Sequence, residues 1–410
     1  METVVNRRYV VPTPLVVLAG TCDRAVAGVA DALVVPGCAV VHHHLAGIGE
    51  GVVHRRVRHG GGDQREVLEL AHGCVSCTLR EDVLPLLIRL AQAPGVDRIV
   101  LHLDPGMEPE AVCWALRHVL VDGHTVLEAL RIEAVLTVID AETWLADATG
   151  DEELAERRPG TLGDDERTVA QVVIGQVEFA DAIVVAGGAP DIGTARRTDA
   201  VLDRLAPLAP RGRVAGLDIE ALLAAVPPEA RRGRLDRVHG PLLRGQPSLH
   251  AEHGVATVLF TSHRPFHPER LHDALQFLLE GVVRARGRVW VATQPDTALY
   301  LESAGEGLGI GHAGPWLAAL DDWTGIDPER CAMAALRWDV RYGDREQALV
   351  VLIHDADPAR IRKALTAALL THDELDADAS AWHDPFEEWH TDPCATAEHA
   401  GNPDNHKGHA

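Results

Sequence analysis

Residues 72–84 read His-Gly-Cys-Val-Ser-Cys-Thr-Leu-Arg-Glu-Asp-Val-Leu, and the rest of the chain is organised around this stretch. A glycine turn precedes two thiols three residues apart, and the residues that follow have the apolar periodicity of a helix. We therefore expect Cys74 and Cys77 at a helix N-terminus. The positive end of the helix would lower their thiol pKa values and favour thiolates that bind a soft or borderline metal. Two half-buried cysteines without a role are the alternative.

Upstream of this stretch, the chain has the frame of a phosphate-binding loop. A short apolar strand from Pro14 ends at Gly20, and an alanine-rich segment with helical periodicity follows. A working loop needs further glycines, a Lys for the β/γ-phosphates and a Ser or Thr for Mg²⁺. Val26 and Ala27 stand at the Lys and Ser/Thr positions. The positions of this degenerate loop are Gly20, Thr21, Ala25, Val26 and Ala27.

Downstream, short apolar strands alternate with helical segments. The expected strands are 39–41, 98–103, 136–140 and 182–186, and the expected helices are 111–120 and 168–179. This alternation predicts an α/β fold, a doubly wound parallel sheet covered on both faces. We place this P-loop NTPase-like domain at residues 1–218.

The remaining chain changes its pattern. Residues 219–253 are expected to be a linker, because Pro, Gly, Arg and His dominate most of the segment. The pattern of residues 254–375 predicts a smaller α+β domain on a mostly antiparallel sheet. Its expected strands are 256–261, 289–293 and 348–353, and its expected helices are 268–279 and 358–369. Residues 376–410 form an acidic tail with several histidines, which we expect to be disordered.

Composition narrows the possible partners and the compartment. The 410 residues carry a formal net charge of −23, which repels nucleic acid and argues against a DNA partner. The sequence contains no run of eighteen apolar residues, the length needed to span a membrane. The N-terminus has no pattern of a secretion signal, and the seven cysteines are mostly isolated. A cytoplasmic protein is therefore expected.

Local basic clusters could still contact RNA or a ribosome. They occur at residues 55–58, 231–234 and 284–288. Such clusters are solvated surface more often than binding sites.

Histidines near the strand ends are further candidate ligands. His42 and His44 can share one face of a strand, where they could bind metal or simply be surface residues. His72 and His102 could each add a ligand to the cysteine pair. His102 also stands close to Asp104, but a histidine at a strand end is more often structural than catalytic.

Short motifs in the C-terminal half carry a family resemblance. They are RPFHPERL at 264–271, GVVRARG at 281–287, WVAT at 290–293, AGPW at 313–316, WD at 338–339 and YGDR at 342–345. Together with the strand–glycine–helix frame and residues 73–83, they resemble the CobW-like P-loop GTPases, a family associated with zinc and cobalt handling. The resemblance spans about residues 14–375. It implies a CobW nucleotide-binding domain followed by a CobW C-terminal domain.

The departures from the family pattern concern both the metal site and the nucleotide site. The family's metal motif is Cys-x-Cys-Cys, and Ser76 replaces its middle thiol. The loop lysine is lost within residues 23–28, the acidic Mg²⁺ motif aligns with residues 103–106, and the guanine-reading Asn-Lys-x-Asp aligns with 186–189. One lost charged contact costs about 1.5–3 kcal/mol, and phosphoryl transfer depends on Lys and Mg²⁺. The sequence therefore predicts a pseudo-GTPase without significant GTP hydrolysis.

Three functions remain open. The chain resembles a CobW-like branch that recruits a ribosome-hibernation factor under zinc limitation, which would make it an interaction protein with a ribosomal partner and a docking surface near residues 284–288. The alternative is a zinc metallochaperone that binds Zn²⁺ at Cys74 and Cys77 and delivers it to client proteins, with residual GTP binding. The third is an enzyme that has reused the fold. Zn²⁺ is the expected metal, whereas GTP and Mg²⁺ are doubtful cofactors.

Overall fold

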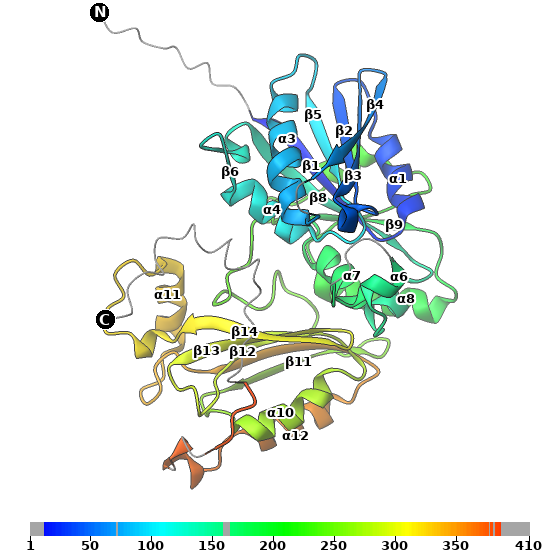
Figure 1. The fold of residues 1–410 in the computed structure, drawn as a ribbon. Helices are drawn as coiled ribbons and strands as arrows, with labels where there is room; N and C mark the ends of the chain where they lie inside the picture. The colour runs from blue at the N-terminus through cyan, green and yellow to red at the C-terminus, as the bar shows by residue number, and fades with distance from the viewer. Residues whose placement is uncertain (1–11, 71–72, 159–164, 377, 380–381, 387–410) are drawn as a thin grey trace, which may run out of the picture.

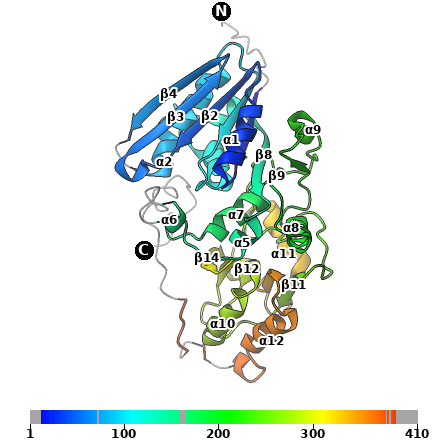
Figure 2. The same cartoon turned by 90° about the vertical axis from the view of Figure 1, so that its right-hand side faces the viewer.

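The computed structural model describes residues 12–70, 73–158, 165–376, 378–379 and 382–386. The chain forms two β-sheets, each with its own helices (Figures 1 and 2). None of the helices in the described residues is both long and apolar enough to cross a membrane.

The first sheet has eight strands in the order β10-β9-β8-β1-β5-β2-β3-β4. Their bounds are β1 Thr13–Ala19, β2 Cys38–His44, β3 Val52–His59, β4 Gly62–Glu69, β5 Arg98–His102, β8 Leu130–Asp140, β9 Ala182–Ala186 and β10 Arg211–Arg213. Neighbours from β10 to β2 run parallel, and β3 and β4 are antiparallel additions. The predicted doubly wound parallel sheet is thus confirmed.

Helices cover both faces of this sheet. They are α1 Asp23–Ala32, α2 Val75–Thr78, a π-turn Leu79–Val83, α3 Leu84–Ala91, α4 Pro109–His118, α5 Trp144–Ala148, α6 Leu154–Arg157, α7 Val169–Glu178, α8 Ile192–Leu205 and α9 Ile219–Ala224. Alternate residues of β1 face the two cores: Leu15 and Val17 pack with α3 and α4, and Val16 and Leu18 pack with α1 and α9. Burial on both sides explains why β1 reads as a continuous apolar run.

The β3–β4 hairpin was not expected from the sequence. Residues 55–58, read as a basic cluster, lie in β3, and Gly60 and Gly61 form its turn with φ of 59° and 82°. Two residues with positive φ are typical of the tight turn that joins hairpin strands. Arg55 pairs with Asp82 and Glu66, Arg56 with Asp63, and Arg58 with Asp31. This cluster is therefore largely neutralised by carboxylates.

The second sheet has five antiparallel strands in the order β11-β15-β12-β13-β14. The strands are β11 Val255–Ser262, β12 Val282–Val289, β13 Thr297–Ala304, β14 Gly307–Pro315 and β15 Gln347–His354, with helices α10 Pro268–Leu275, α11 Pro328–Arg337 and α12 Pro358–Ala368. Helices α10 and α12 lie on one face (Figure 1). The strand expected at 289–293 is wrong in position: β12 ends at Val289, and its hydrogen-bonded partners are β13 and β15.

The two sheets are joined through a shared core and an ion-pair cluster. Trp144 and Val172 share an apolar cluster with Val283 and Leu352 of the second sheet. At the same junction, the largely buried carboxylate of Glu178 pairs with Arg284 at 3.1 Å and with Arg286 at 3.5 Å. Arg288 pairs with Glu346 at 3.1 Å. Arg284 and Arg286 are partly buried and Arg288 is buried. All three pair with carboxylates, which does not favour the docking surface expected near residues 284–288.

The segment between the sheets is only partly irregular. Helix α9 occupies the start of the expected linker 219–253, and Leu222 and Leu223 pack against the first sheet. The guanidinium of Arg231 pairs with Asp236, and that of Arg232 donates to the backbone carbonyls of residues 226–228. Residues 225–254 contribute no helix or strand to the described structure. The domain boundaries themselves remain predictions.

Candidate metal site and nucleotide-binding region

Cys74 and Cys77 lie at the start of the helical segment that covers the first sheet. Cys74 is the N-cap of α2, with φ −134° and ψ 152°, and its sulfur accepts a hydrogen bond from the Cys77 N–H at 3.2 Å. Thr78 donates its hydroxyl to the Cys74 carbonyl at 3.1 Å. The two Sγ atoms are 2.7 Å apart, and both residues are partly exposed. The two thiols are therefore together and accessible at a helix start.

The expected lowering of the pKa is wrong in direction for Cys77. The hydrogen bond with Cys74, together with burial, raises the pKa of Cys77 to about 11. Two thiols in contact cannot both ionise easily, because the second thiolate would face the first. A metal ion that binds this pair must therefore release protons, which makes its affinity pH-dependent.

The pair fits Zn²⁺ as an incomplete site. With Zn–S bonds of about 2.3 Å in tetrahedral geometry, two ligating sulfurs stand roughly 3.8 Å apart, so the thiols must separate by about 1 Å. Such a change is within reach of side-chain rotation at a partly exposed position. Among the residues that the structure describes, no three His, Cys, Asp or Glu side chains are grouped so as to hold a metal. His72, expected as a third ligand, lies outside the described residues.

A charged cluster that the sequence reading missed holds the helix that follows the thiols. Asp82 lies in the π-turn after α2 and contacts His43 of β2 at 2.7 Å, and Arg55 of β3 pairs with its other oxygen. Burial raises the pKa of Asp82, but the hydrogen bond from His43 and the charge of Arg55 outweigh it and leave this pKa below its usual value. The sequence around Asp82, five residues after Cys77, does not indicate these contacts, because the partners His43 and Arg55 come from two other strands.

The strand histidines form a stacked pair. His42 and His44 do share a face of β2, with ring centroids 6.1 Å apart. His42 stacks on His102 at 4.0 Å, and its Nδ1 lies 3.0 Å from the His102 carbonyl oxygen. Burial lowers the pKa of both rings, to about 3 for His102. Both imidazoles are therefore neutral near pH 7, and the stack supports a structural role.

The degenerate phosphate loop is closed by its own side chains. Gly20 has φ +151°, and a Cβ there would lie 2.4 Å from the Val138 carbonyl oxygen and 2.7 Å from Val26 Cγ2. Only glycine fits this turn. Val26, at the family's lysine position, is 1% exposed and belongs to the core under α1. Thr21 and Ala25 are partly exposed and Ala27 is exposed.

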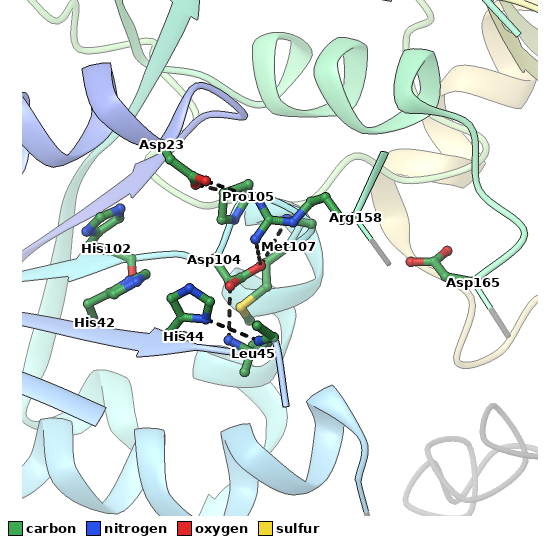
Figure 3. A network of polar contacts seen from close by, with 12 residues as sticks. Asp23, His42, His44, Leu45, His102, Asp104, Pro105, Met107, Arg158 and Asp165 are labelled. Atoms are coloured by element: carbon green, nitrogen blue, oxygen red, sulfur yellow. Dashed lines mark hydrogen bonds and ion pairs between the residues drawn. The ribbon is translucent and has the colours of Figure 1, made fainter. Parts of the chain in front are cut away.

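Carboxylates surround the start of α1, where a phosphate would bind in a working loop. Arg158 lies 3.5 Å from both Asp23 in the first turn of α1 and the buried Asp104 (Figure 3). Asp104 also accepts the Leu45 N–H at 3.0 Å. Nearby, the Cys22 thiol donates to Asp140 at 3.7 Å. Arg158 was missed because it is distant in sequence from its partners and no local motif marks it.

The region expected to read guanine offers no charged base contact from residues 186–189, which are Ala, Gly, Gly and Ala. A cavity of about 290 Å³ lies beside this segment. Its lining residues include Ile139, Val185, Ile192, Leu202, Asp191 and Arg213. Thr198 and Asp199 also line it, so the pocket has a mixed apolar and polar lining.

These features define a two-domain protein with an α/β nucleotide-binding-type sheet, a modified phosphate loop and a partly exposed pair of thiols. The family models that match are the CobW/HypB/UreG nucleotide-binding domain at residues 48–202 and the cobalamin synthesis protein cobW C-terminal domain at residues 255–369. The first match begins after the degenerate loop.

Curated relatives support the same assignment. The zinc chaperone Rv0106 of Mycobacterium tuberculosis is 47% identical over 343 residues, which cover 80% of this chain and 81% of that protein. The zinc-regulated GTPase metalloprotein activator 1 of Dictyostelium discoideum is 25% identical over 334 residues, 77% of this chain and 68% of that protein. The chain therefore belongs to the CobW family.

A solved structure shows a weaker likeness. The Zn(II)-bound YjiA GTPase from E. coli is 14% identical, with a TM-score of 0.35, over 88% of this chain and 100% of that chain.

Proposed function

We propose that this chain is a zinc-handling pseudo-GTPase of the CobW family that binds Zn²⁺ between Cys74 and Cys77 and passes it to client proteins. The observation that carries the proposal is the contact between two partly exposed thiols, 2.7 Å apart at a helix start. The names of its relatives, a zinc chaperone and a zinc-regulated metalloprotein activator, agree with this role.

An incomplete ligand set suits transfer. Two thiolates leave two positions of a tetrahedral Zn²⁺ open, and a client protein or water can fill them. The ion then moves by ligand exchange, in which client ligands replace Cys74 and Cys77 one at a time. The His43–Asp82 contact ties the following helix to the sheet, so the thiols stay in position while the ligands change.

GTP does not fit the residues at the start of α1. The buried Val26 supplies no positive charge, and the carboxylates of Asp23 and Asp104 would face the phosphates. The guanidinium of Arg158 is shared between those two carboxylates. Since phosphoryl transfer depends on positioning and on neutralising charge, these residues support no hydrolysis. In this proposal, Zn²⁺ transfer proceeds without a nucleotide cycle.

The recruitment of a hibernation factor to ribosomes is a second candidate. The altered nucleotide region favours it, because an interaction protein needs the scaffold but not the chemistry. Arg284, Arg286 and Arg288 already pair with Glu178 and Glu346, so a ribosomal contact would have to use other residues. Sedimentation through a sucrose gradient with ribosomes from zinc-replete and zinc-depleted cells tests it. Co-migration only after zinc depletion would support recruitment.

Isothermal titration of the purified chain tests the proposed function. We expect Zn²⁺ to bind with a stoichiometry near one and to be withdrawn rapidly by a chromophoric chelator. We expect no heat from GTP with Mg²⁺, with or without Zn²⁺. Tight GTP binding with measurable turnover would refute the pseudo-GTPase assignment, and an absence of Zn²⁺ binding would refute the chaperone assignment.

A further inference from the structure

Strand β4 is the last strand of the eight-stranded sheet, and among the residues that the structure describes it pairs only with β3 (Figure 2). All of its residues are exposed except the partly buried Leu68. In an antiparallel pair, every second residue turns its N–H and C=O away from its partner strand. The Leu70 N–H donates to Gly51 at 2.8 Å on the β3 side, so the even-numbered residues face β3. The backbone groups of Asp63, Arg65, Val67 and Glu69 therefore point outward.

The side chains of these four residues share one face of the strand and form a pattern that is complementary to itself. Arg65 and Glu69 lie two residues before and two residues after Val67, which is 61% exposed. Arg65 makes only a 3.3 Å contact with Asp63, and Glu69 has no ion-pair partner among the described residues. A second β4 strand that runs antiparallel and is centred on Val67 would place Arg65 of each strand opposite Glu69 of the other.

We propose that β4 pairs antiparallel with β4 of a second copy of this chain, about a two-fold axis at Val67. In this register Val67 faces the partner's Val67, and Arg65 and Glu69 face the partner's Glu69 and the partner's Arg65. The outward N–H and C=O groups form the ladder, and the two sheets become one continuous sheet. The contact is isologous, as a two-fold dimer requires.

The three registers centred closer to the hairpin turn are less favourable. A pairing centred on Arg65 sets Arg65 against its own copy, and one centred on Glu66 sets Glu66 against its copy and Asp63 against Glu69. Like charges directly opposite each other destabilise a strand pair. A pairing centred on Gln64 gives an Asp63–Arg65 match, but Asp63 is already held by two hydrogen bonds from Arg56. That register would also leave the exposed Val67 opposite the turn glycine Gly61.

Charge reversal tests this register. The mass of the full-length chain is measured by sedimentation equilibrium in EDTA, so that metal cross-linking through Cys74 cannot mimic a dimer. Wild type is expected at twice 44.1 kDa. Arg65→Glu and Glu69→Arg should each raise the dimer dissociation constant by about tenfold, because two attractive contacts become repulsive. The double variant R65E/E69R should restore the wild-type value.

A backbone variant provides an independent check. Val67→Pro removes an outward N–H at an edge position where β3 pairing does not need it, so it should abolish the dimer without unfolding the chain. Val67→Thr keeps the N–H and should remain dimeric. Circular dichroism verifies that each variant is folded. A monomeric wild type, an unchanged dimer in V67P, or a double variant that stays monomeric would overturn the proposal. It is independent of zinc binding, so either proposal can fail alone.

Discussion

The side chain of Val26 packs against the turn at Gly20, so closely that a Cβ on Gly20 would come 2.7 Å from Val26 Cγ2. In a working phosphate loop, the position of Val26 is occupied by the lysine whose side chain reaches the phosphates. Here the same position is 1% exposed and belongs to the core beneath α1. Replacement of the lysine has therefore turned a ligand position into a packing position, and the loop is held in place by apolar contact.

Restoring the family residues should damage the fold without restoring nucleotide binding. Val26→Lys places an ammonium group in an apolar core, which we expect to lower the free energy of unfolding by about 3 kcal/mol. Ala27→Thr changes an exposed position and should have little effect. Urea denaturation measures the stability, and titration with GTP measures binding. A V26K/A27T variant that is stable and binds GTP would contradict this view of the loop.

The contact between His43 and Asp82 should make stability depend on pH in the acidic range. The pKa of Asp82 in the folded chain lies below the unfolded value of about 3.9, so its ionised form stabilises the fold above that pH. This contribution is lost as the pH falls through the folded-state pKa. Asp82→Asn should cost about 1–2 kcal/mol near pH 7, and the difference from wild type should shrink below about pH 4.

An exposed carboxylate in β4, which pairs with the strand of Arg55, is the matched control for this prediction. Asp63 also pairs with an arginine, Arg56, but both side chains are solvent-accessible and the interaction is screened. Asp63→Asn should therefore change the unfolding free energy far less than Asp82→Asn. Equal effects of the two substitutions, measured by denaturation across the acidic pH range, would show that burial does not set the contribution of Asp82.

Glu178 should control the association of the two domains. Its largely buried carboxylate lies between Arg284 and Arg286, whose charges outweigh the effect of burial and lower its pKa. Glu178→Gln leaves two arginines in the junction without this charge, at an expected cost of about 3 kcal/mol. Differential scanning calorimetry should then show two transitions or a lower midpoint. Glu302→Gln removes a more exposed partner of Arg284 and should have a smaller effect. An unchanged calorimetric trace for E178Q would contradict this role.

Thiol reactivity should separate the metal-site cysteines from the core cysteines. Cys38 and Cys113 are buried, at 2% and 0% exposure, whereas Cys74 and Cys77 are partly exposed. Alkylation followed by peptide mass mapping should modify Cys74 and Cys77 in the native chain, and Cys38 and Cys113 only after unfolding. Saturating Zn²⁺ should protect the first pair, because thiolates bound to Zn²⁺ are blocked. Modification of Cys74 and Cys77 at the same rate with and without Zn²⁺ would argue against a site there.

Local sequence patterns were sufficient to predict most of the first sheet. The apolar run ending at Gly20 is β1, and Ala182–Ala186 is β9 with the bounds expected from its composition. These strands are buried on both faces, so the signal is strong. The hairpin of β3 and β4 is mostly polar because one strand forms an exposed edge, and its arginines read as a basic cluster instead.

The site could be predicted only where it is local in sequence. Cys74 and Cys77 are three residues apart, so their proximity follows from the helix start alone. The contacts of Asp82 with His43 and of Arg158 with Asp104 join residues 39 and 54 positions apart. The stacking of His42 on His102 likewise depends on β2 and β5 being neighbours in the sheet. Such pairs depend on the order of the strands in the sheet, and local patterns in a single sequence do not reveal that order.

Zinc content is the most direct test of the proposed function. The wild-type chain, the double variant C74S/C77S and the control Cys331→Ser, another partly exposed cysteine, are loaded with Zn²⁺, dialysed and analysed by plasma emission. The proposal predicts Zn²⁺ in a stoichiometry near one for the wild type and the control, and loss of that ion in the double variant. Unchanged zinc content in C74S/C77S would show that these thiols do not form the site.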